Sequence, residues 1–278
     1  MEIGIVGAGR VGCSIGKYMK EHGATVVGYF SKSRGSVESA ATFTGTATFP
    51  TLGELVKASD MIFIATPDDV IRSVWESIKE EPIQGKIVCH FSGSLSSVVF
   101  SGREQAGVSG CSAHPMYAFS NKYTSYEQLN QVLFTMEGDK KALAEVSYVL
   151  EQAGIRCCVI DSAKKERYHA AASMVSNMMI GLYQMGIDML QDCGFEKDAA
   201  QLLVEPLVRG NIHNLLATSP EQALTGPIER NDVDTVAKHL AVLTEEEQAV
   251  YKNLAHKLAE IAMRKNPEID YGSIMDII

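Results

Sequence analysis

The alternation of short apolar runs with helical segments is the feature that most constrains the fold of this chain. Up to about residue 161, uncharged or nearly uncharged runs recur, and each has the length of a strand rather than of a helix. Continuous apolar runs are typical of strands buried on both faces of a sheet. The alternation therefore predicts an α/β fold with a mostly parallel, doubly wound sheet. The predicted strands are "IGIV", "TVVGYF", "MIFIAT", "KIVCHF", "VLFTME" and "IRCCVI".

Beyond Asp161 the strand pattern stops, and helical periodicity continues almost to the C-terminus. We therefore predict two domains, an α/β domain over residues 1–161 and an all-α domain over residues 162–278. In the second domain, Thr244 and Glu247 have the spacing of a capping box ahead of a long amphipathic helix. Such a box predicts a helix that begins just after Thr244.

Charge and composition exclude several classes of partner. The formal net charge of −9 argues against a general nucleic-acid or anionic-membrane binder, because phosphate surfaces repel such a protein. Residues 170–187 are long enough for a membrane span, but the polar side chains inside this stretch make a lipid environment costly. We expect neither a nucleic acid nor a membrane as a partner.

The cysteines and the N-terminus favour a cytoplasmic protein. The six cysteines show no metal-ligand spacing and lie mostly in apolar runs, as reduced core cysteines do. No metal site is therefore predicted. The first predicted strand begins at the start of the chain, so no signal peptide is expected before it.

Three glycines with the spacing G-x-G-x-x-G lie directly between the first strand and the first helix. Gly7 permits a tight turn, Gly9 lets a pyrophosphate approach the backbone, and Gly12 allows close packing of helix and strand. The N-terminus of the helix attracts the phosphate charge. This context predicts a dinucleotide site formed by Gly7, Ala8, Gly9, Arg10, Val11 and Gly12.

The residues after the second strand favour NADP(H) over NAD(H). An NAD site usually has an acidic residue here for the ribose hydroxyls, but the chain reads "SKSR" and has no acid before Glu38. Hydroxyl and guanidinium groups are suited to a 2′-phosphate. We predict that the phosphate is bound by Ser31, Lys32, Ser33 and Arg34. The alternative is that these residues form only a solvated loop.

Two further strands end in residues suited to the cofactor. "ATPDD" and "FSGS" follow apolar runs, at the carboxyl ends where an open parallel sheet forms its crevice. We predict that the ribose and nicotinamide are bordered by Ala65, Thr66, Pro67, Ser92 and Gly93. Pro67 at the start of a helix also has an ordinary capping explanation.

Several motifs along the whole chain occur in the same order in one known family. They are "GIVGAGRVG", "FSGS", the "HP" pair at 114–115, "YHAAASMVSN", "ALTGPIERND" and "TVAKHL". The chain resembles the NADP-binding Rossmann-like proteins whose helical C-terminal domain is called domain of unknown function 2520. Its layout is more distantly similar to pyrroline-5-carboxylate reductase, ketopantoate reductase and the β-hydroxyacid dehydrogenases, the layout of 6-phosphogluconate dehydrogenase. The resemblance implies NADP and dimers, but no settled substrate.

The uncharged stretch from Tyr168 to Gly186 is the predicted substrate-facing helix. Its polar side chains fall within one arc of the helix, and this arc has no Lys, Glu or Arg. Among them, His169 and Asn177 favour an enclosed cleft; the alternative is a packed helix whose polar groups satisfy one another. In the β-hydroxyacid dehydrogenases a catalytic lysine stands four residues before the asparagine. Here that position is Ser173.

A proton donor for the predicted cleft has three candidates. His114 ends a strand, and histidine titrates near neutrality, so either His114 or His169 suits a hydride-transfer step. Tyr168 is the third candidate. Lys164 and Lys165 are interpreted as the solvated entrance of the helix. We thus predict His114, Asn177 and His169 as the catalytic residues.

Two functions from different classes fit these residues. The first is an NADP(H)-dependent oxidoreductase that acts on a small carbonyl or imine compound. The second is a non-catalytic NADP(H)-binding sensor or scaffold, which the missing lysine favours. In either case the apolar faces of the helical domain, with Met174, Met178, Met185 and Met189, predict a homodimer through that domain.

Overall fold

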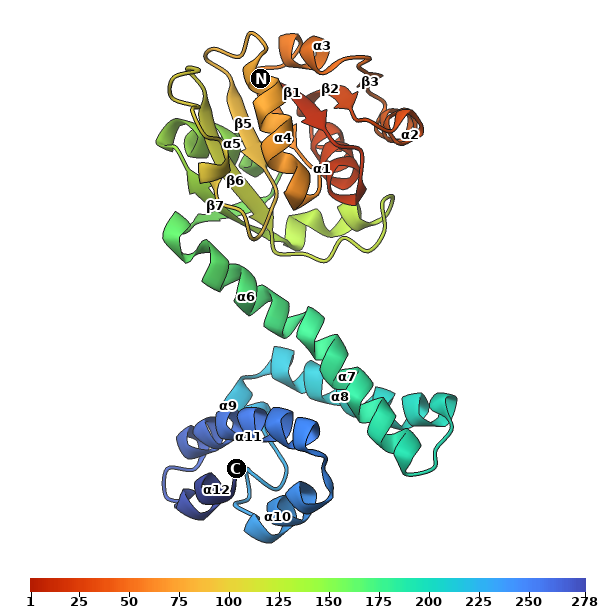
Figure 1. The fold of residues 1–278 in the computed structure, drawn as a ribbon, viewed down its shortest axis with the longest axis vertical. Helices are drawn as coiled ribbons and strands as arrows, with labels where there is room; N and C mark the ends of the chain where they lie inside the picture. Colours follow the sequence, from red (N-terminus) through yellow and green to blue (C-terminus); the bar gives the residue numbers. More distant parts are fainter. The chain divides into compact units, whose positions relative to one another are not determined.

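The computed structural model describes residues 1–278, which form two compact units, Met1–Met179 and Ile180–Ile278. The first unit contains the sheet (Figure 1). Its strands are β1 (Glu2–Val6), β2 (Thr25–Phe30), β3 (Ala47–Thr48), β4 (Met61–Ile64), β5 (Ile87–His90), β6 (Ser109–Pro115), β7 (Leu133–Gly138) and β8 (Arg156–Val159). Its helices are α1 (Arg10–Glu21), α2 (Arg34–Thr44), α3 (Leu52–Lys57), α4 (Asp68–Lys79), α5 (Lys140–Gln152) and α6 (Lys165–Val175), with 3-10 turns η1 (Ser97–Val99), η2 (Ser125–Gln131) and η3 (Ser162–Lys164).

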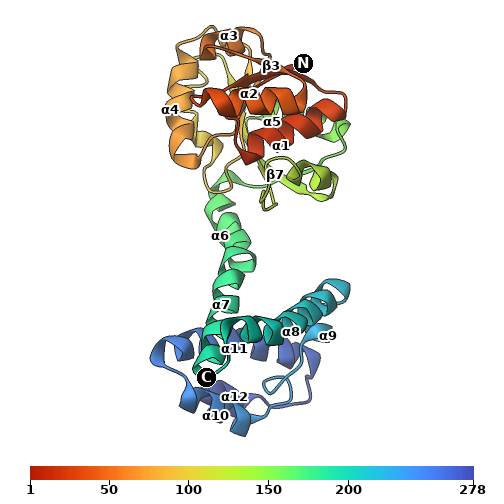
Figure 2. The ribbon, with the colours of Figure 1, turned by 90° about the vertical axis from the view of Figure 1, so that its right-hand side faces the viewer.

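The eight strands form one sheet in the order β3-β2-β1-β4-β5-β6-β7-β8. All neighbours are parallel except β6 and β7, which pair antiparallel. Helices α1, α2 and α5 pack on one face of the sheet and α3 and α4 on the other, each with its own apolar core (Figure 2). The predicted doubly wound α/β fold is confirmed.

All six strands predicted from apolar runs are present, and so is the strand predicted to end near His114, which is β6; the short β3 completes the sheet. β3 is only two residues long and is exposed, so it has no apolar run from which it could be predicted. β6 reads "SGCSAHP", in which serine, glycine and histidine stand among the apolar residues, and η1 packs against it. A run of apolar residues does not show in which direction a strand runs, so the sequence did not predict that β7 is antiparallel to β6.

The stretch that was predicted as one substrate-facing helix is divided in two. α6 ends at Val175, and α7 (Asn177–Asp192) begins after Ser176, whose φ of −118° and ψ of −75° interrupt the helix. The Ser176 hydroxyl bonds back to the carbonyl oxygen of Ala172 at 2.7 Å, a contact of the kind that bends helices. The compact units divide within α7, later than the predicted domain boundary at residue 161; Lys165 and Tyr168 hold the start of α6 to β6.

The second unit is entirely helical. It contains most of α7 together with α8 (Lys197–Ala217), α9 (Pro220–Ala223), α10 (Val233–Val242), α11 (Glu245–Lys265) and α12 (Gly272–Ile277). Its core includes Val236, Ala259 and Tyr271. The predicted capping box is present, with Thr244 and Glu247 bonding each other's backbone at the start of α11. None of the helices combines the length and apolar character needed to cross a membrane.

Candidate functional site

The glycine loop between β1 and α1 has the geometry that a pyrophosphate requires. Gly7 has a φ of +108°, and a Cβ atom there would lie 2.5 Å from the carbonyl oxygen of Ala65. A Cβ atom at Gly12 would lie 2.2 Å from the carbonyl oxygen of Gly7. Both positions therefore exclude larger residues. At Gly9, by contrast, no protein atom lies within 4 Å of an added Cβ atom, so this backbone faces open space.

The N-terminus of α1 is free to bind a negative charge. Its N-cap is Gly9, so no side chain caps the first turn, and no acidic residue lies in that turn. The first free N–H groups of a helix attract anions. Next to the loop, the hydroxyl oxygen of Thr66 is buried and has no hydrogen-bond partner within the protein. The glycine loop and Thr66 thus fit a dinucleotide phosphate and ribose.

Three of the four residues predicted to bind the 2′-phosphate, Ser31, Lys32 and Arg34, line a cavity of about 470 Å³ at the end of β2. Thr48 and Phe49 line it too, whereas Ser33 does not. Arg34 is exposed and begins α2, and its Nε lies 2.8 Å from Oε1 of Glu38. Ser33 caps the same helix by accepting a hydrogen bond from the Ser36 amide at 3.4 Å. The positive side chains and the helix N-terminus both suit a phosphate.

The ends of β4 and β5 meet in one edge of the sheet, as parallel neighbours must. Ser92 is buried there, and its hydroxyl donates to Oδ2 of Asp68 at 2.7 Å. The hydroxyl of Ser94 donates to the same oxygen, also at 2.7 Å. The Ser92 side chain therefore fixes the loop after β5 to the start of α4, and the backbone of Gly93 is the part of this loop that faces the neighbouring side chains.

Two histidines lie against that loop. A Cβ atom at Gly93 would approach Nε2 of His114 and Cδ2 of His169 to 2.7 Å each, so both rings touch the loop backbone. The two ring centroids are 6.3 Å apart. β6 runs parallel to β5, so His114, near the carboxyl end of β6, lies at the same edge of the sheet as Gly93. The structure thus brings His114, His169 and Gly93 together.

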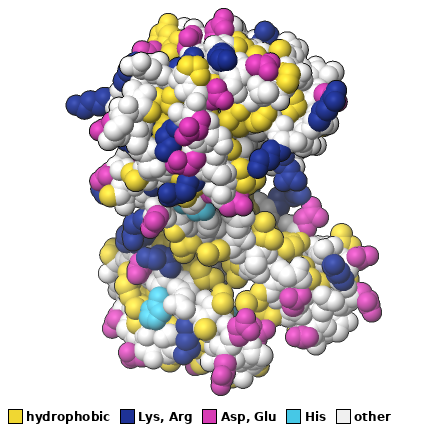
Figure 3. Space-filling model, turned by 45° about the horizontal axis from the view of Figure 1, so that its top comes forward, with side chains coloured by type: hydrophobic (Ala, Val, Ile, Leu, Met, Phe, Trp, Pro, Cys, Tyr) yellow, Lys and Arg dark blue, Asp and Glu magenta, His cyan; other side chains and the backbone are white.

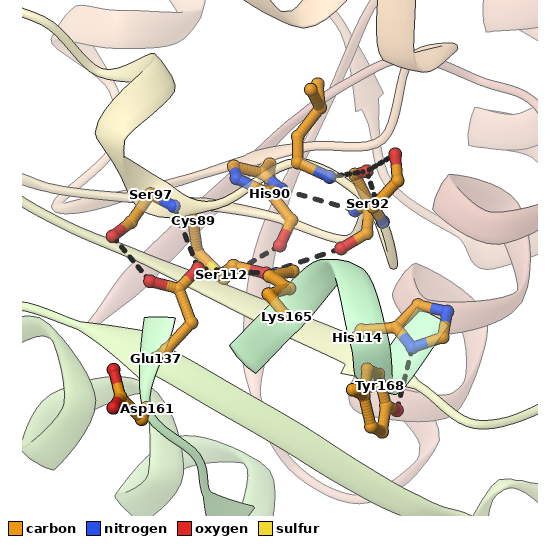
Figure 4. A network of polar contacts seen from close by, with 12 residues as sticks. Cys89, His90, Ser92, Ser97, Ser112, His114, Glu137, Asp161, Lys165 and Tyr168 are labelled. Carbon is orange, nitrogen blue, oxygen red and sulfur yellow. Dashed lines mark hydrogen bonds and ion pairs between the residues drawn. The ribbon is translucent and has the colours of Figure 1, made fainter. Parts of the chain in front are cut away.

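His114 is held by a phenol (Figure 4). Its Nδ1 lies 2.9 Å from the hydroxyl of Tyr168 on α6, and the two rings meet edge to face. Burial, then the charge of Lys165 and then that of His169 lower the pKa of His114 to about 4, while Asp68 opposes the shift. At neutral pH the imidazole is therefore uncharged, with Nδ1 bonded to Tyr168 and Nε2 directed to the Gly93 loop.

Asn177 is not part of this group of side chains. It begins α7, is exposed, and its Oδ1 accepts a hydrogen bond from the hydroxyl of Ser176 at 3.1 Å. Eight residues of helix separate it from His169, a rise of about 12 Å along the axis. Ser173, at the position of the lysine in the β-hydroxyacid dehydrogenases, is half-buried. The roles of Asn177 and His169 stay predictions.

Lys165 was placed wrongly as part of a solvated entrance; only its neighbour Lys164 is exposed. The Lys165 side chain is 2% exposed, bonds the hydroxyl of Ser112, and lies 3.3 Å from Oε1 of Glu137. Burial lowers its pKa, and the carboxylate of Glu137 opposes that shift. The sequence held a signal for this: Lys165 stands three and four residues before Tyr168 and His169, and hence on the same face of a helix.

The motif "ALTGPIERND" lies elsewhere, in the helical unit. Thr225, Pro227 and Ile228 line an apolar pocket of about 390 Å³ together with residues of α7, α10 and α11. Asp232 caps α10 by accepting a hydrogen bond from the Thr235 amide. His239 bonds the Tyr251 hydroxyl at 3.0 Å, which satisfies its Nδ1. Arg230 is exposed.

The first unit is thus a dinucleotide-binding domain with two histidines and a tyrosine at its crevice. Residues 2–92 match the family model described as NADP oxidoreductase, coenzyme F420-dependent. Residues 132–258 match the model of the domain of unknown function 2520. The family resemblance and NADP(H) as the cofactor are confirmed by these two matches.

Solved structures share this fold over nearly the whole chain. A protein from Thermotoga maritima is 25% identical with a TM-score of 0.75, covering 95% of this chain and 99% of that one. A candidate NADP oxidoreductase from Bacteroides fragilis is 20% identical with a TM-score of 0.71, covering 93% and 98%. An imine reductase from Myxococcus stipitatus in complex with NADP⁺ is 18% identical with a TM-score of 0.62, covering 99% of both chains. None of the curated proteins compared with this chain matches it.

Proposed function

We propose that this protein is an NADP(H)-dependent oxidoreductase that transfers a hydride to or from a small carbonyl or imine compound. The observation that carries the proposal is the pair His114 and Tyr168, which lies against Gly93 at the crevice edge of the sheet. A protein that only binds a nucleotide has no need of a hydrogen-bonded acid/base pair at this place. The imine reductase fold of the solved relative supports the substrate class.

When bound, the cofactor would supply the hydride in the reductive direction and accept it in the oxidative direction. Residues of the chain donate or accept the accompanying proton. When Tyr168 donates its hydrogen to Nδ1, the uncharged His114 carries its own proton on Nε2, the atom that faces the Gly93 loop. In the reductive direction this proton passes from Nε2 to the substrate oxygen or nitrogen, while the Tyr168 proton moves onto Nδ1. In the oxidative direction both protons move the opposite way.

The other two predicted site residues take supporting roles in this proposal. His169 touches the same loop backbone as His114 and shields the proton-transfer pair from water on the α6 side. Asn177 presents an exposed amide at the junction of α6 and α7, too far from His114 to contact the reacting atom, and hydrogen-bonds a more distant polar group of the substrate. An amide suits this task because it both donates and accepts hydrogen bonds.

We further propose that the protein works as a homodimer in the reducing cytoplasm. Large apolar side chains are exposed along α6, α7 and α8, among them Met174 at 62% and Met178 at 61%. Figure 3 shows hydrophobic side chains gathered on the face of the molecule that it draws. Exposed apolar surface of this extent marks an interaction site. All six cysteines are free thiols, which suits a reducing compartment.

The test is a screen for NADPH oxidation. Purified protein is mixed with NADPH and with each member of a panel of cyclic imines, aldehydes and 2-keto acids, and nicotinamide absorbance is followed. We expect at least one compound to accelerate oxidation above the rate in the absence of protein. Tight NADPH binding without acceleration by any member would favour the alternative, a non-catalytic NADP(H) sensor or scaffold.

A further inference from the structure

Lys165 lies at the centre of a buried polar network that none of the steps above uses. Its ammonium group bonds the Ser112 hydroxyl and lies 3.3 Å from Oε1 of Glu137, and both charged side chains are 2% exposed. Glu137 also accepts hydrogen bonds from the amide and the hydroxyl of Ser97, each at 2.8 Å. Figure 4 shows this network beside His114 and Tyr168.

The network connects the three segments that form the candidate site. Ser112 is two residues before His114 on β6, so the two side chains point to the same face of the sheet. Lys165 is three residues before Tyr168 on α6, so these two share a helix face. The contacts of Lys165 with Ser112 and of Tyr168 with His114 therefore join α6 to β6 twice. Ser97 lies in η1, directly after the loop that carries Gly93.

Stability alone does not account for a charge at this place. A buried ion pair usually contributes no more to stability than apolar residues of the same volume, because both ions lose their hydration. The ion pair of Lys165 and Glu137 lies next to His114, a histidine that can gain or lose a proton. From this geometry we propose that Lys165 is a positioning residue of the reaction: its ammonium group fixes the first turn of α6 against β6 and sets a positive charge beside the His114 imidazole. The proposal rests on the proposed function, since it gives His114 its protonation state for that reaction.

The surroundings of His114 identify Lys165 as the cation that matters. The His114 ring is approached from α6 by Lys165, Tyr168 and His169. From α4 it is approached by the carboxylate of Asp68. Burial is the main cause of the low pKa of His114; Lys165 and then His169 lower it further, whereas Asp68 raises it. Lys165 likewise lowers the pKa of the buried His90 on β5. Without the ammonium group, His114 takes up a proton nearer to neutral pH.

The test measures the His114 pKa directly, without substrate. Full-length protein labelled in its histidine rings is titrated by NMR, and His114→Asn identifies the signal. In Lys165→Met we expect the pKa of His114 to rise by about one unit, the size of shift that a charge nearby in a partly buried site produces. Lys165→Arg keeps the charge and restores the low value. The matched control Lys164→Met, which removes an exposed neighbouring charge, leaves the value unchanged.

Two outcomes overturn the proposal: a His114 pKa in Lys165→Met that stays at the wild-type value, or an equal rise in Lys164→Met. Should Lys165→Met not fold, the double variant Lys165→Met/Glu137→Gln removes both charges, avoids an unpaired buried ion, and is expected to show the same rise. Failure of the proposed function would appear differently, as a shifted His114 pKa in a protein that oxidises no NADPH with any compound of the panel.

Discussion

The hydroxyl of Tyr168 fixes Nδ1 of His114 at 2.9 Å, which leaves Nε2 as the only ring nitrogen directed to the Gly93 loop. This arrangement assigns different tasks to the two nitrogens of one histidine. In the proposed function, Nδ1 exchanges a proton with the phenol, and Nε2 exchanges one with the substrate. A helix and a strand that lie far apart in the sequence supply the two partners.

Removal of the phenol tests this division of tasks. Tyr168→Phe keeps the ring that packs against His114 but loses the hydroxyl. Because a positioned acid/base group contributes about 10²–10⁴-fold in rate, we expect kcat to fall by at least about tenfold. NADPH affinity, measured by fluorescence titration, remains at the wild-type value. Wild-type turnover in Tyr168→Phe would show that Nδ1 needs no proton partner.

Arg34 is expected to determine the cofactor preference. A charged hydrogen-bonded phosphate contact contributes about 1.5–3 kcal/mol, so calorimetry should show NADP(H) bound at least about tenfold more tightly than NAD(H). Arg34→Glu should abolish or reverse this preference, because it places a second carboxylate beside Glu38. Arg72→Glu, with the same charge change on an exposed site of α4, serves as the control. Equal affinity of the wild type for both cofactors would contradict the assignment.

The buried His90 and the half-buried His114 predict a loss of stability in mild acid. The pKa of His114 is lowered from 6.5 to about 4, and that of His90 from 6.5 to about 3, mainly by burial. Between those values the unfolded chain binds protons that the folded chain does not, so stability is full above the unfolded pKa and falls as the pH drops below it. Each histidine contributes a slope of up to about 1.4 kcal/mol per pH unit.

Urea unfolding between pH 7 and pH 5 measures this slope. The free energy of unfolding should fall with pH in the wild type and fall less steeply in His114→Asn, whose side chain does not titrate. A free energy that is constant across this range would show that His114 and His90 titrate normally.

The exposed apolar helices predict the oligomeric state. Light scattering at micromolar concentration should give the mass of a dimer for the wild type. Met174→Glu combined with Met178→Glu should shift the mass toward the monomer, because buried carboxylates without partners are costly. Tyr148→Glu on α5, a residue that is 60% exposed in the first unit, should not change it. A wild-type monomer would show that no second copy covers these helices.

The sequence was sufficient to predict the strands whose side chains are buried on both faces, since these strands are continuous apolar runs. It was sufficient for the glycine loop too, because the G-x-G-x-x-G spacing falls directly between a strand and a helix. Larger residues are excluded at Gly7 by the carbonyl oxygen of Ala65 and at Gly12 by that of Gly7. Lys165 could not be assigned in the same way. It stands among Lys164, Glu166 and Arg167, and only its helical spacing to Tyr168 and His169 separates it from these three, a signal that becomes useful once those two residues are known to face the sheet.

Glu137 is a second reason why the buried network around Lys165 could not be predicted from the sequence. It is the only charged residue of its apolar run, and its partners Ser97 and Lys165 lie 40 and 28 residues away. Pairing over such distances depends on the order of strands in the sheet, and β6 and β7 are antiparallel neighbours in an otherwise parallel arrangement. The interruption of the helix at Ser176 is equally hidden, because serine is tolerated within helices as well as at their ends.

The most direct test of the account is the rate of NADPH oxidation by wild-type protein and by His114→Ala, each saturated with NADPH and supplied with the most active compound of the panel. The account predicts turnover by the wild type and a loss of about 10²-fold or more in His114→Ala, with NADPH affinity unchanged. Equal turnover by the two proteins would contradict it, since the proton would then reach the substrate without His114.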